Sequence, residues 1–372
     1  MKIAYIYDAV YPWIKGGVEK RIYEIARRLV ERGHEVHCFG LKWWDGGKDI
    51  VMDGINLHGI GKWNNLYVNG RRSIKEALYF GIKTLTGLKG SFDVIDCQEF
   101  PYFSCFSAKV HSLLKKSELV ITWHEVWGDY WFEYLGKKGI FGWSAEKLTT
   151  KLTDKNVAVS ERTKKDLERI GVKNIKVIPN GIDFRRIEKV KPSEEESDII
   201  FVGRLIKEKN VDVLIKAVEL VKREIPDVKC IIIGDGPERS KLEKLATYLG
   251  VDDNIKFIGF LENHDDVIAY MKSSKVFVLL STREGFGIVA LEANACGLPV
   301  VTVNHERNAA TEIITNGKNG FICKLSERDV AEKILIGLDR RKDIEGRCIE
   351  NAIKYDWDRI AGLAESFYRS LV

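Results

Sequence analysis

The chain has 372 residues, of which 45% are hydrophobic and 30% are charged, and its formal net charge is +5. This length suits two domains with separate cores. No run of 18 apolar residues occurs, so the sequence predicts no transmembrane helix. The first eight residues become polar too early for a signal peptide and predict a strand instead. The seven cysteines are scattered without a C-x-x-C pair, which argues against a disulfide framework or a zinc knuckle and favours reduced thiols in the cytoplasm.

The charge is unevenly distributed along the chain. Residues 1–176 contain 29 Lys and Arg against 21 Asp and Glu, a net +8, whereas the remainder has 30 against 33, a net −3. A basic first half favours an anionic partner such as a phosphate or a membrane surface, and is too weakly charged to indicate nucleic acid. Many charges combined with a single glutamine, Gln98, are typical of a thermophilic source.

Short apolar runs alternate with helical patterns along most of the chain. Several runs, such as 199–202, are continuously apolar, as expected for strands of a parallel sheet covered by helices on both faces. The sequence therefore predicts a doubly wound α/β architecture. The expected strands are 2–7, 35–41, 93–97, 119–123, 157–160, 199–203, 229–234, 255–259, 276–280 and 299–303.

The β/α series occurs twice, which indicates two domains. The first series ends with a helix at 161–170, and the second begins at 199. Between them lie the turn Pro179-Asn180-Gly181 and a charged stretch around Glu194-Glu195-Glu196, a composition typical of a linker. We place an N-terminal domain at 1–176 and a C-terminal domain at 177–355.

The loops that follow the strands are the expected ligand sites, because open parallel sheets bind ligands beyond the carboxyl ends of their strands. Gly16-Gly17 precedes a helix and would allow backbone N–H groups to approach a phosphate, or forms an ordinary tight turn. The absence of G-x-G-x-x-G argues against an NAD enzyme. Arg204 and Lys209 follow the strand at 199–203 and could both reach a diphosphate, or could be solvated surface cations.

Two further loops complete the candidate site. Gly234 opens a turn that could border a nucleotide base. Glu284 and Glu292 flank Gly285-Phe286-Gly287-Ile288, and eight residues span just over two helical turns, which would place both carboxylates on one face. Glu292 lies among apolar residues and needs a partner, which a ribose diol or an ion pair in the core would supply.

At these residues the chain resembles the family-4 retaining glycosyltransferases, which have the GT-B fold of two Rossmann-like doubly wound parallel-sheet domains facing a central cleft. Glu284 and Glu292 match the E-x7-E pattern of that family. The match extends over nearly the whole chain through the ordered motifs Gly16-Gly17, Pro179-Asn180-Gly181-Ile182-Asp183, Gly203-Arg204-Leu205, Gly234-Asp235-Gly236-Pro237 and Gly297-Leu298-Pro299.

The resemblance implies a role for each matched position. Gly16 and Gly17 would lie against the donor diphosphate, which Arg204 and Lys209 would neutralise as it departs. Glu292 would bind the ribose hydroxyls, while Glu284 and the backbone from Gly285 through Phe286 and Gly287 to Ile288 would hold the donor sugar. His124 would approach that sugar, unless it is a core histidine. The last helix, 356–372, would cross back onto the N-terminal domain.

The implied reaction moves a sugar from a nucleotide-diphosphate donor, UDP more often than GDP, to a glycan or lipid-linked acceptor with retention of configuration. No D-x-D pattern accompanies the motifs, so we expect neither a metal nor a cofactor. In one respect the chain departs from the family, because residues 305–310 replace paired glycines that often precede Glu312-Ile313. Alternatives are a sugar-nucleotide epimerase of similar architecture and a non-catalytic sugar-nucleotide-binding subunit.

Aromatic and basic residues gather in the first half of the chain. Eight of the nine tryptophans precede residue 144, and cations open a helical stretch at 71–88. Aromatic rings interleaved with cations suit a lipid interface or a stacked sugar, and the competing interpretation is that many of these rings are core. We predict that this half carries the acceptor site and contacts an anionic membrane on the cytoplasmic side.

Overall fold

The structure is a computed structural model that describes residues 1–68 and 71–372. It divides into two compact units: unit 1 comprises Met1–Asn180 and Trp357–Val372, and unit 2 comprises Gly181–Asp356. The predicted domain boundaries at 176/177 and 355/356 lie four residues and one residue before these divisions. The chain therefore enters unit 2 once and returns to unit 1 for its last helix.

Unit 1 is built on an eight-stranded sheet in the order β10-β9-β8-β7-β1-β2-β4-β3, in which only the edge strand β3 runs antiparallel to its neighbour. A separate antiparallel pair joins β5 to β6. The strands are β1 Lys2–Ile6, β2 Glu35–Leu41, β3 Asp49–Met52, β4 Ile55–Gly61, β5 Tyr67–Val68, β6 Arg71–Arg72, β7 Val94–Gln98, β8 Glu118–Trp123, β9 Asn156–Ala158 and β10 Ile175–Val177.

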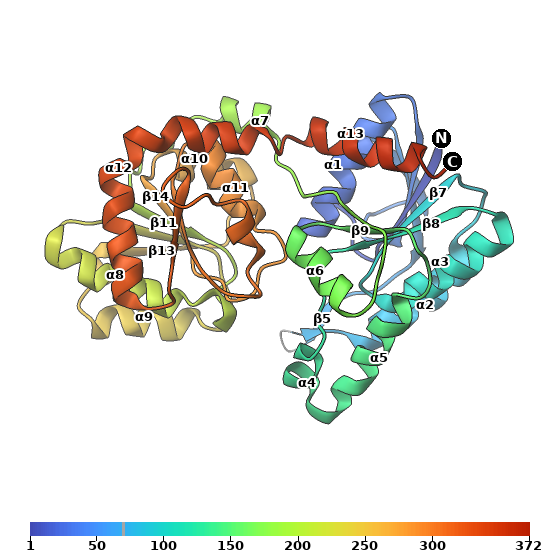
Figure 1. The fold of residues 1–372 in the computed structure, drawn as a ribbon, viewed down its shortest axis with the longest axis horizontal. Coiled ribbons are helices and arrows are strands. Elements are labelled where there is room, and N and C mark those ends of the chain that lie inside the picture. The colour runs from blue at the N-terminus through green and yellow to red at the C-terminus, as the bar shows by residue number, and fades with distance from the viewer. Residues whose placement is uncertain (69–70) are drawn as a thin grey trace. The chain divides into compact units, whose positions relative to one another are not determined.

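Helices cover both faces of this sheet (Figure 1). Helices α1 and α13 pack together on one face, and α2 and α3 pack together on the other. The helices of unit 1 are α1 Gly17–Glu31, α2 Ile74–Gly87, α3 Tyr102–Lys115, α4 Tyr130–Leu135, η1 Gly136–Lys138, α5 Gly139–Thr149, α6 Glu161–Arg169 and α13 Trp357–Arg369. Each of the two faces has its own apolar core.

The last helix, α13, is an integral part of unit 1. Its Trp357 is fully buried, and its Tyr368 hydroxyl donates a hydrogen bond of 2.6 Å to Asp96 in β7. Glu365 accepts from Arg32 at 2.9 Å and contacts His34 at 3.0 Å. Because Trp357 belongs to this unit, all nine tryptophans lie in unit 1.

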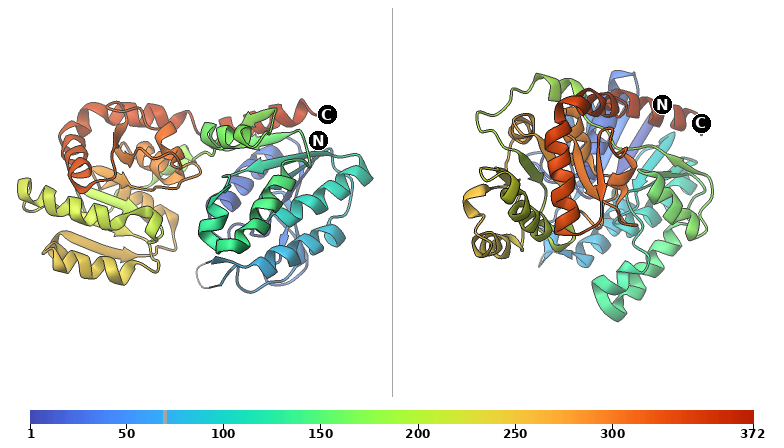
Figure 2. Two further views of the ribbon diagram at one scale, coloured as in Figure 1. Left: turned by 60° about the horizontal axis from the view of Figure 1, so that its bottom comes forward. Right: turned by 60° about the vertical axis from the view of Figure 1, so that its left-hand side comes forward.

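Unit 2 has a six-stranded, entirely parallel sheet in the order β13-β12-β11-β14-β15-β16. Helices again cover both faces, as the rotated views show (Figure 2). The strands are β11 Ile199–Val202, β12 Cys230–Ile233, β13 Ile255–Gly259, β14 Val276–Leu279, β15 Val300–Val303 and β16 Gly320–Cys323. The helices are α7 Phe184–Lys189, η2 Lys207–Lys209, α8 Val211–Glu224, α9 Arg239–Tyr248, η3 Asp252–Asn254, α10 His264–Lys272, α11 Ile288–Ala295, η4 Ala309–Glu312 and α12 Glu327–Ile353.

The predicted strands all correspond to strands of the two sheets, with ends that differ by at most two residues. The sequence interpretation missed the hairpin β3–β4 and the short strands β5, β6, β10 and β16. All seven cysteines are free and buried, as their scattered spacing predicted. In the part of the chain that the structure describes, no helix combines the length and apolarity needed to cross a membrane.

Candidate functional site

The strand order of unit 2 defines where a ligand can bind. Strand β11 has β12 on one side and β14 on the other. The connection after β11 therefore runs toward one edge of the sheet and the connection after β14 runs toward the other edge. Such a switch point leaves a crevice at the carboxyl ends of the strands, where doubly wound folds bind nucleotides. The loop after β11 contains Arg204 and Lys209, and the loop after β14 contains Glu284.

Hydrogen bonds tie these loops together. Thr282, after β14, donates its backbone N–H to Glu208 O at 2.9 Å, and Leu205, after β11, donates to Asp235 O at 2.9 Å. A shorter link joins two predicted site residues, because Lys209 Nζ lies 2.6 Å from Glu284 Oε2. Both side chains are mostly buried, with 16% and 19% of their surface exposed. Arg204 is exposed on the same loop.

The structure corrects the geometry expected for Glu284. The eight-residue spacing does not place Glu284 and Glu292 on one helical face, because helix α11 begins only at Ile288. Glu284 instead lies in an extended segment whose N–H bonds Arg307 O at 2.8 Å and whose carbonyl accepts from Ala309 at 2.9 Å. The segment 305–310 is therefore the direct backbone neighbour of Glu284.

Glu292 has a protein partner within its own unit. The side chain is 3% exposed on α11, and its Oε1 lies 2.9 Å from Nε2 of His264 at the start of α10. The sequence interpretation did not identify His264, since it lies 28 residues earlier with no local motif. Glu292 is thus held in place by the protein, and a ribose diol would share it with His264.

The turn between the two glutamates depends on glycine. Gly287 has φ +91°, a left-handed conformation, and a Cβ there would lie 2.8 Å from that of Ala310. Phe286 is buried and its ring packs edge-on against Tyr355. The Phe286 side chain is therefore not available to a ligand.

Gly234 allows two loops to pack closely against each other. It follows β12 with φ +130°, and a Cβ there would lie 1.9 Å from Gly203 O. Only glycine lets the loops after β11 and β12 approach this closely. The position of this loop permits the predicted contact of Gly234 with a nucleotide base. That contact stays a prediction.

Unit 1 has its own switch point, between β1 and β7. His124 follows the adjacent strand β8, and its Nε2 lies 2.8 Å from Gln98 Oε1. The Gln98 amide nitrogen donates to Asp96 at 2.9 Å, which fixes the amide orientation and makes His124 Nε2 the donor. Burial lowers the pKa of His124 to about 3. The imidazole is therefore neutral and presents Nδ1 as an acceptor.

The paired glycines of unit 1 open helix α1, as predicted. Gly16 is the N-cap residue in an extended conformation, so it does not need glycine for its backbone angles. A Cβ on Gly16 would instead meet the Glu19 carboxylate at 2.5 Å. A glutamate in the first turn of the helix already lies where an anion would approach the helix N-terminus.

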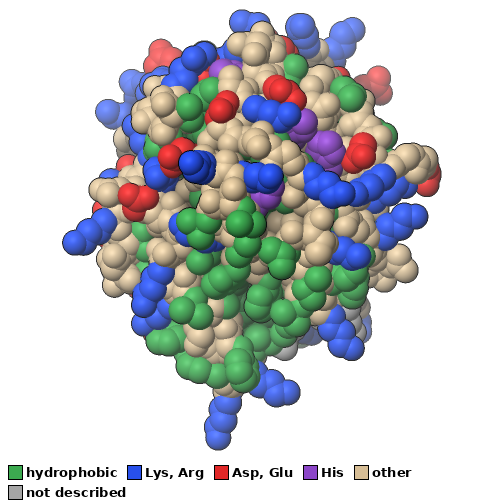
Figure 3. Space-filling view, turned by 90° about the vertical axis from the view of Figure 1, so that its right-hand side faces the viewer, with side chains coloured by type: hydrophobic (Ala, Val, Ile, Leu, Met, Phe, Trp, Pro, Cys, Tyr) green, Lys and Arg blue, Asp and Glu red, His purple; other side chains and the backbone are tan. Residues whose placement is uncertain are grey.

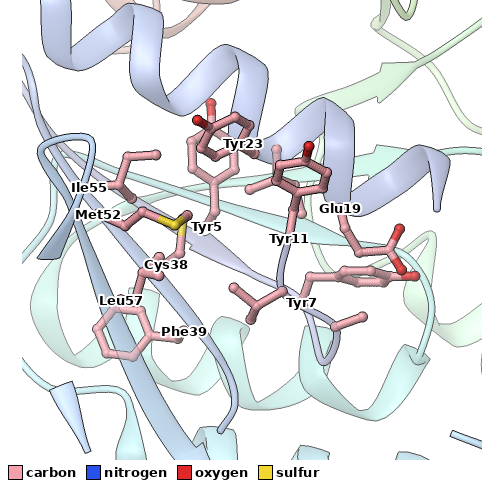
Figure 4. A pocket seen from close by; sticks show the side chains of 13 residues that line it. Tyr5, Tyr7, Tyr11, Glu19, Tyr23, Cys38, Phe39, Met52, Ile55 and Leu57 are labelled. Atoms are coloured by element: carbon pink, nitrogen blue, oxygen red, sulfur yellow. The ribbon is translucent and has the colours of Figure 1, made fainter. Parts of the chain in front are cut away.

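Glu19 borders a small cavity of about 20 Å³, enough for one water molecule. Figure 4 shows its carboxylate turned toward Tyr7, beside Tyr11. Burial raises the pKa of Glu19 to about 7, and the nearby charge of Asp8 adds to this effect. The carboxyl group therefore titrates near neutral pH.

A buried acidic pair lies at the end of β1. Asp8 is fully buried and its carboxylate pairs with the Arg72 guanidinium. Burial, followed by the charge of Asp8, raises the pKa of the fully buried Glu76 to about 9. Glu76 is therefore protonated at neutral pH. Burial also raises the pKa of Asp8, and the charge of Arg72 opposes this rise. The sequence interpretation did not single out either carboxylate.

The predicted site residues thus fall into two groups. Arg204, Lys209, Glu284 and the turn that begins at Gly285 lie at the switch point of unit 2. Gly16, Gly17 and His124 lie on loops at the carboxyl edge of the sheet in unit 1. All members of each group belong to the same unit.

Two family models account for most of the chain. A model described as Glycosyltransferase Family 4 matches residues 15–186, and one described as Glycosyl transferases group 1 matches residues 183–355. The chain belongs to the family-4 glycosyltransferases. This glycosyltransferase is also 28% identical over 327 residues to an uncharacterized glycosyltransferase of Haemophilus influenzae, covering 87% of this chain and 86% of that one.

Solved structures identify the fold of the glycosyltransferase. It superimposes on sucrose-phosphate synthase from Thermosynechococcus elongatus with a TM-score of 0.82 at 18% identity, covering 100% of this chain and 98% of that one. It superimposes on HepE from Anabaena, solved in complex with UDP and glucose, with a TM-score of 0.73 at 21% identity, covering 98% and 99%. The glycosyltransferase has the GT-B fold, as the sequence predicted.

Proposed function

We propose that this glycosyltransferase takes its sugar from a nucleoside-diphosphate donor, a UDP-sugar in preference to a GDP-sugar, and transfers it with retention of configuration. The observation that carries the proposal is the Lys209–Glu284 pair at the switch point of unit 2. A cation held there by a carboxylate suits a site for a sugar diphosphate. The UDP and glucose of the Anabaena structure support the choice of UDP.

In the proposed reaction, negative charge builds on the diphosphate as its bond to the sugar breaks. Lys209 and Arg204 stabilise this charge, and fixed cations in a site that excludes water stabilise such charge more than water does. Glu284 and the backbone from Gly285 to Ile288 hold the sugar, and Glu292 holds the ribose. The leaving phosphate accepts the proton of the acceptor, which attacks the same face of the sugar. Neither a metal ion nor a cofactor takes part.

Unit 1 supplies the acceptor side in this proposal. His124, with its neutral imidazole, approaches the donor sugar, and Gly16 and Gly17 approach the diphosphate. The acceptor is a glycan or a lipid-linked molecule, and the basic surface of unit 1 contacts an anionic membrane.

The test incubates the full chain with radiolabelled UDP- and GDP-sugars in the absence of acceptor. Slow release of free sugar is expected, because a transferase hydrolyses its donor when water replaces the acceptor. A thermal-shift panel identifies the donor, since a ligand at 100 times its Kd stabilises the fold by about 2.7 kcal/mol. Tight binding without turnover would favour a non-catalytic subunit, and an epimeric sugar nucleotide would favour an epimerase.

A further inference from the structure

A large groove lies on unit 1, and its lining includes Trp127 from the loop that also carries His124. Its cavity volume is about 980 Å³, at the upper end of the range for small-molecule sites. Helices α2 to α5 and the segment 62–65 supply its walls. Aromatic rings dominate the lining, namely Trp63, Phe100, Tyr102, Phe103, Trp127, Trp131, Tyr134 and Phe141.

The groove presents ring faces, because several polar edges of these rings are already bonded. Trp127 Nε1 donates to Glu125 at 2.6 Å, and Tyr102 Oη donates to Glu146 at 2.9 Å. Trp63 Nε1 donates to the Asn65 carbonyl at 3.0 Å. A glycan needs hydrogen-bond partners along its length, and these three ring edges are already used, which leaves mainly Asn64, Asn65, Ser73 and the basic side chains as polar groups of the lining. The lining therefore suits a hydrocarbon chain better than a sugar chain.

The charged residues that line the groove are all basic. Lys62, Lys75, Lys138 and Arg72 contribute to it, and no Asp or Glu occurs among the lining residues that the structure describes. Arg72 is paired with Asp8, so the three lysines give the groove its positive character. This complements an anionic head group attached to the hydrocarbon chain.

The groove opens on an apolar face. Figure 3 shows hydrophobic side chains gathered on the lower part of one face of unit 1, with lysines and arginines around them. Exposed apolar residues of α2 to α5 include Ile74, Leu78, Ile82, Leu85, Phe103, Val110, Leu113, Leu114, Phe132, Ile140, Phe141 and Leu148. A continuous apolar surface of this kind marks an interaction site, and it would let a lipid enter the groove directly from a bilayer.

We infer that this groove binds the hydrocarbon chain of a lipid phosphate, with the phosphate at Lys62, Lys75 and Lys138, and that this lipid is the acceptor. The inference rests on the proposed function, in which unit 1 carries the acceptor site. It selects a lipid-linked acceptor over a free glycan.

Alkyl phosphates that carry a terminal bromine test this inference below their aggregation concentrations. Bromine quenches tryptophan fluorescence on contact, and Trp63, Trp127 and Trp131 line the groove. We expect saturable quenching that strengthens about tenfold for every two added methylenes, from about 0.8 kcal/mol per buried methylene. The bromoalkyl alcohol of equal length should bind several-fold more weakly, and inorganic phosphate should not compete at millimolar concentration.

Matched variants locate the site. Lys138→Glu should weaken binding several-fold, whereas Lys137→Glu, an exposed neighbour outside the lining, should not. Likewise Phe141→Ser should weaken binding and Phe132→Ser should not. Absence of saturable quenching, equal affinity for alcohol and phosphate, or equal effects within either pair of variants would overturn the inference.

Donor hydrolysis without acceptor separates this test from that of the proposed function. The four variants should all retain donor hydrolysis, since none of the substituted residues lies in the donor site. If the protein hydrolyses its donor but does not bind the lipid, the inference about the groove is wrong and the proposed function is not affected. If it binds the lipid but does not hydrolyse a donor, the proposed function is contradicted and lipid binding by the groove is not.

Discussion

Lys209 and Glu284 come from loops 75 residues apart and are joined at 2.6 Å across the switch point of unit 2. The ammonium group has three N–H donors, so the bond to one carboxylate oxygen leaves it able to contact phosphate oxygens. The carboxylate fixes the position of the cation before a donor binds. Such preorganisation is what makes charge stabilisation in an enzyme effective.

We predict that Lys209→Ala and Arg204→Ala each reduce turnover about 100- to 1,000-fold, with a much smaller change in donor Kd. Charge on the leaving diphosphate grows as the bond breaks, and removing one such contact costs about 2.7–4 kcal/mol. Steady-state kinetics with donor titration measure both effects. Lys207→Ala, on the same 3₁₀ turn but exposed, is the control. Unchanged turnover in both variants would remove the leaving-group role.

Glu284 and Lys209 should behave as one unit. Glu284→Gln keeps the side-chain shape but removes the charge that orients Lys209. We expect the double variant with Lys209→Ala to lose little more activity than Lys209→Ala alone, with a coupling energy of about 0.5–3 kcal/mol. A double-mutant cycle on kcat/KM measures this coupling. Additive losses would show that the two residues act independently.

We predict that activity survives EDTA. The only D-x-D sequence, Asp356-Trp357-Asp358, has other roles: Asp356 accepts the Phe184 N–H at 3.2 Å, and Asp358 pairs with Arg28. The cations at the switch point of unit 2 would balance the diphosphate instead. Sugar release before and after chelation is the measurement. Loss of activity that magnesium or manganese restores would contradict the proposed mechanism.

Glu19 should make stability and donor binding depend on pH. Because burial raises its pKa from 4.5 to about 7, the folded state holds more protons than the unfolded state between these values. The contribution of Glu19 to stability is therefore fully present below about pH 4.5 and is lost as pH rises through about 7. Glu19→Gln should remove this loss and raise stability at pH 8 by about 1–3 kcal/mol, as measured by denaturant unfolding.

The same variant tests the role of Gly16. If the diphosphate approaches Gly16-Gly17, the ionised Glu19 opposes it. Glu19→Gln should then strengthen donor binding at pH 8 and leave it nearly unchanged at pH 5.5. Calorimetric titration at both pH values measures this difference. Equal donor affinities of the variant and the parent at pH 8 would remove these glycines from the diphosphate site.

Unit 1 should bind anionic vesicles at low salt and not neutral ones. Each basic residue near such a surface contributes about 1 kcal/mol, and the apolar side chains of α2 and α3 add to this. Flotation with liposomes measures the binding. Leu114→Asp, on α3, should weaken it, whereas Leu363→Asp, on α13, should not. Absence of binding to anionic vesicles would favour an acceptor free in solution.

The sequence predicted strands that are continuously apolar, such as Ile199–Val202. It missed β4, where Asn56, His58 and two glycines interrupt the apolar pattern, and β16, whose four residues begin with a glycine. In both, pairing with a neighbouring strand determines the structure. The competing interpretation of the tryptophans as core residues holds for Trp44, Trp123 and Trp131, which are buried, whereas Trp13 is exposed. The membrane contact of this half stays a prediction.

In the candidate site, too, the sequence predicted local features but not the contacts that form only on folding. Motifs identified the loops that carry Lys209 and Glu284, but not the bond between them. Helical periodicity misplaced Glu284 because the helical spacing was applied across the turn at Gly287, whereas the helix begins only at Ile288. His264 and Gln98 were missed as partners of Glu292 and His124, because only folding brings them together.

The return of the chain to unit 1 has a consequence for synthesis on the ribosome. Unit 2 is one continuous stretch and can fold as soon as Asp356 has emerged. Unit 1 must wait, because Trp357 and Tyr368 complete its core and reach the buried Asp96. Until residues 357–372 have emerged, apolar side chains of α1 remain uncovered and available to chaperones. Synthesis of unit 1 thus begins before that of unit 2, and its core is completed after unit 2 has been made.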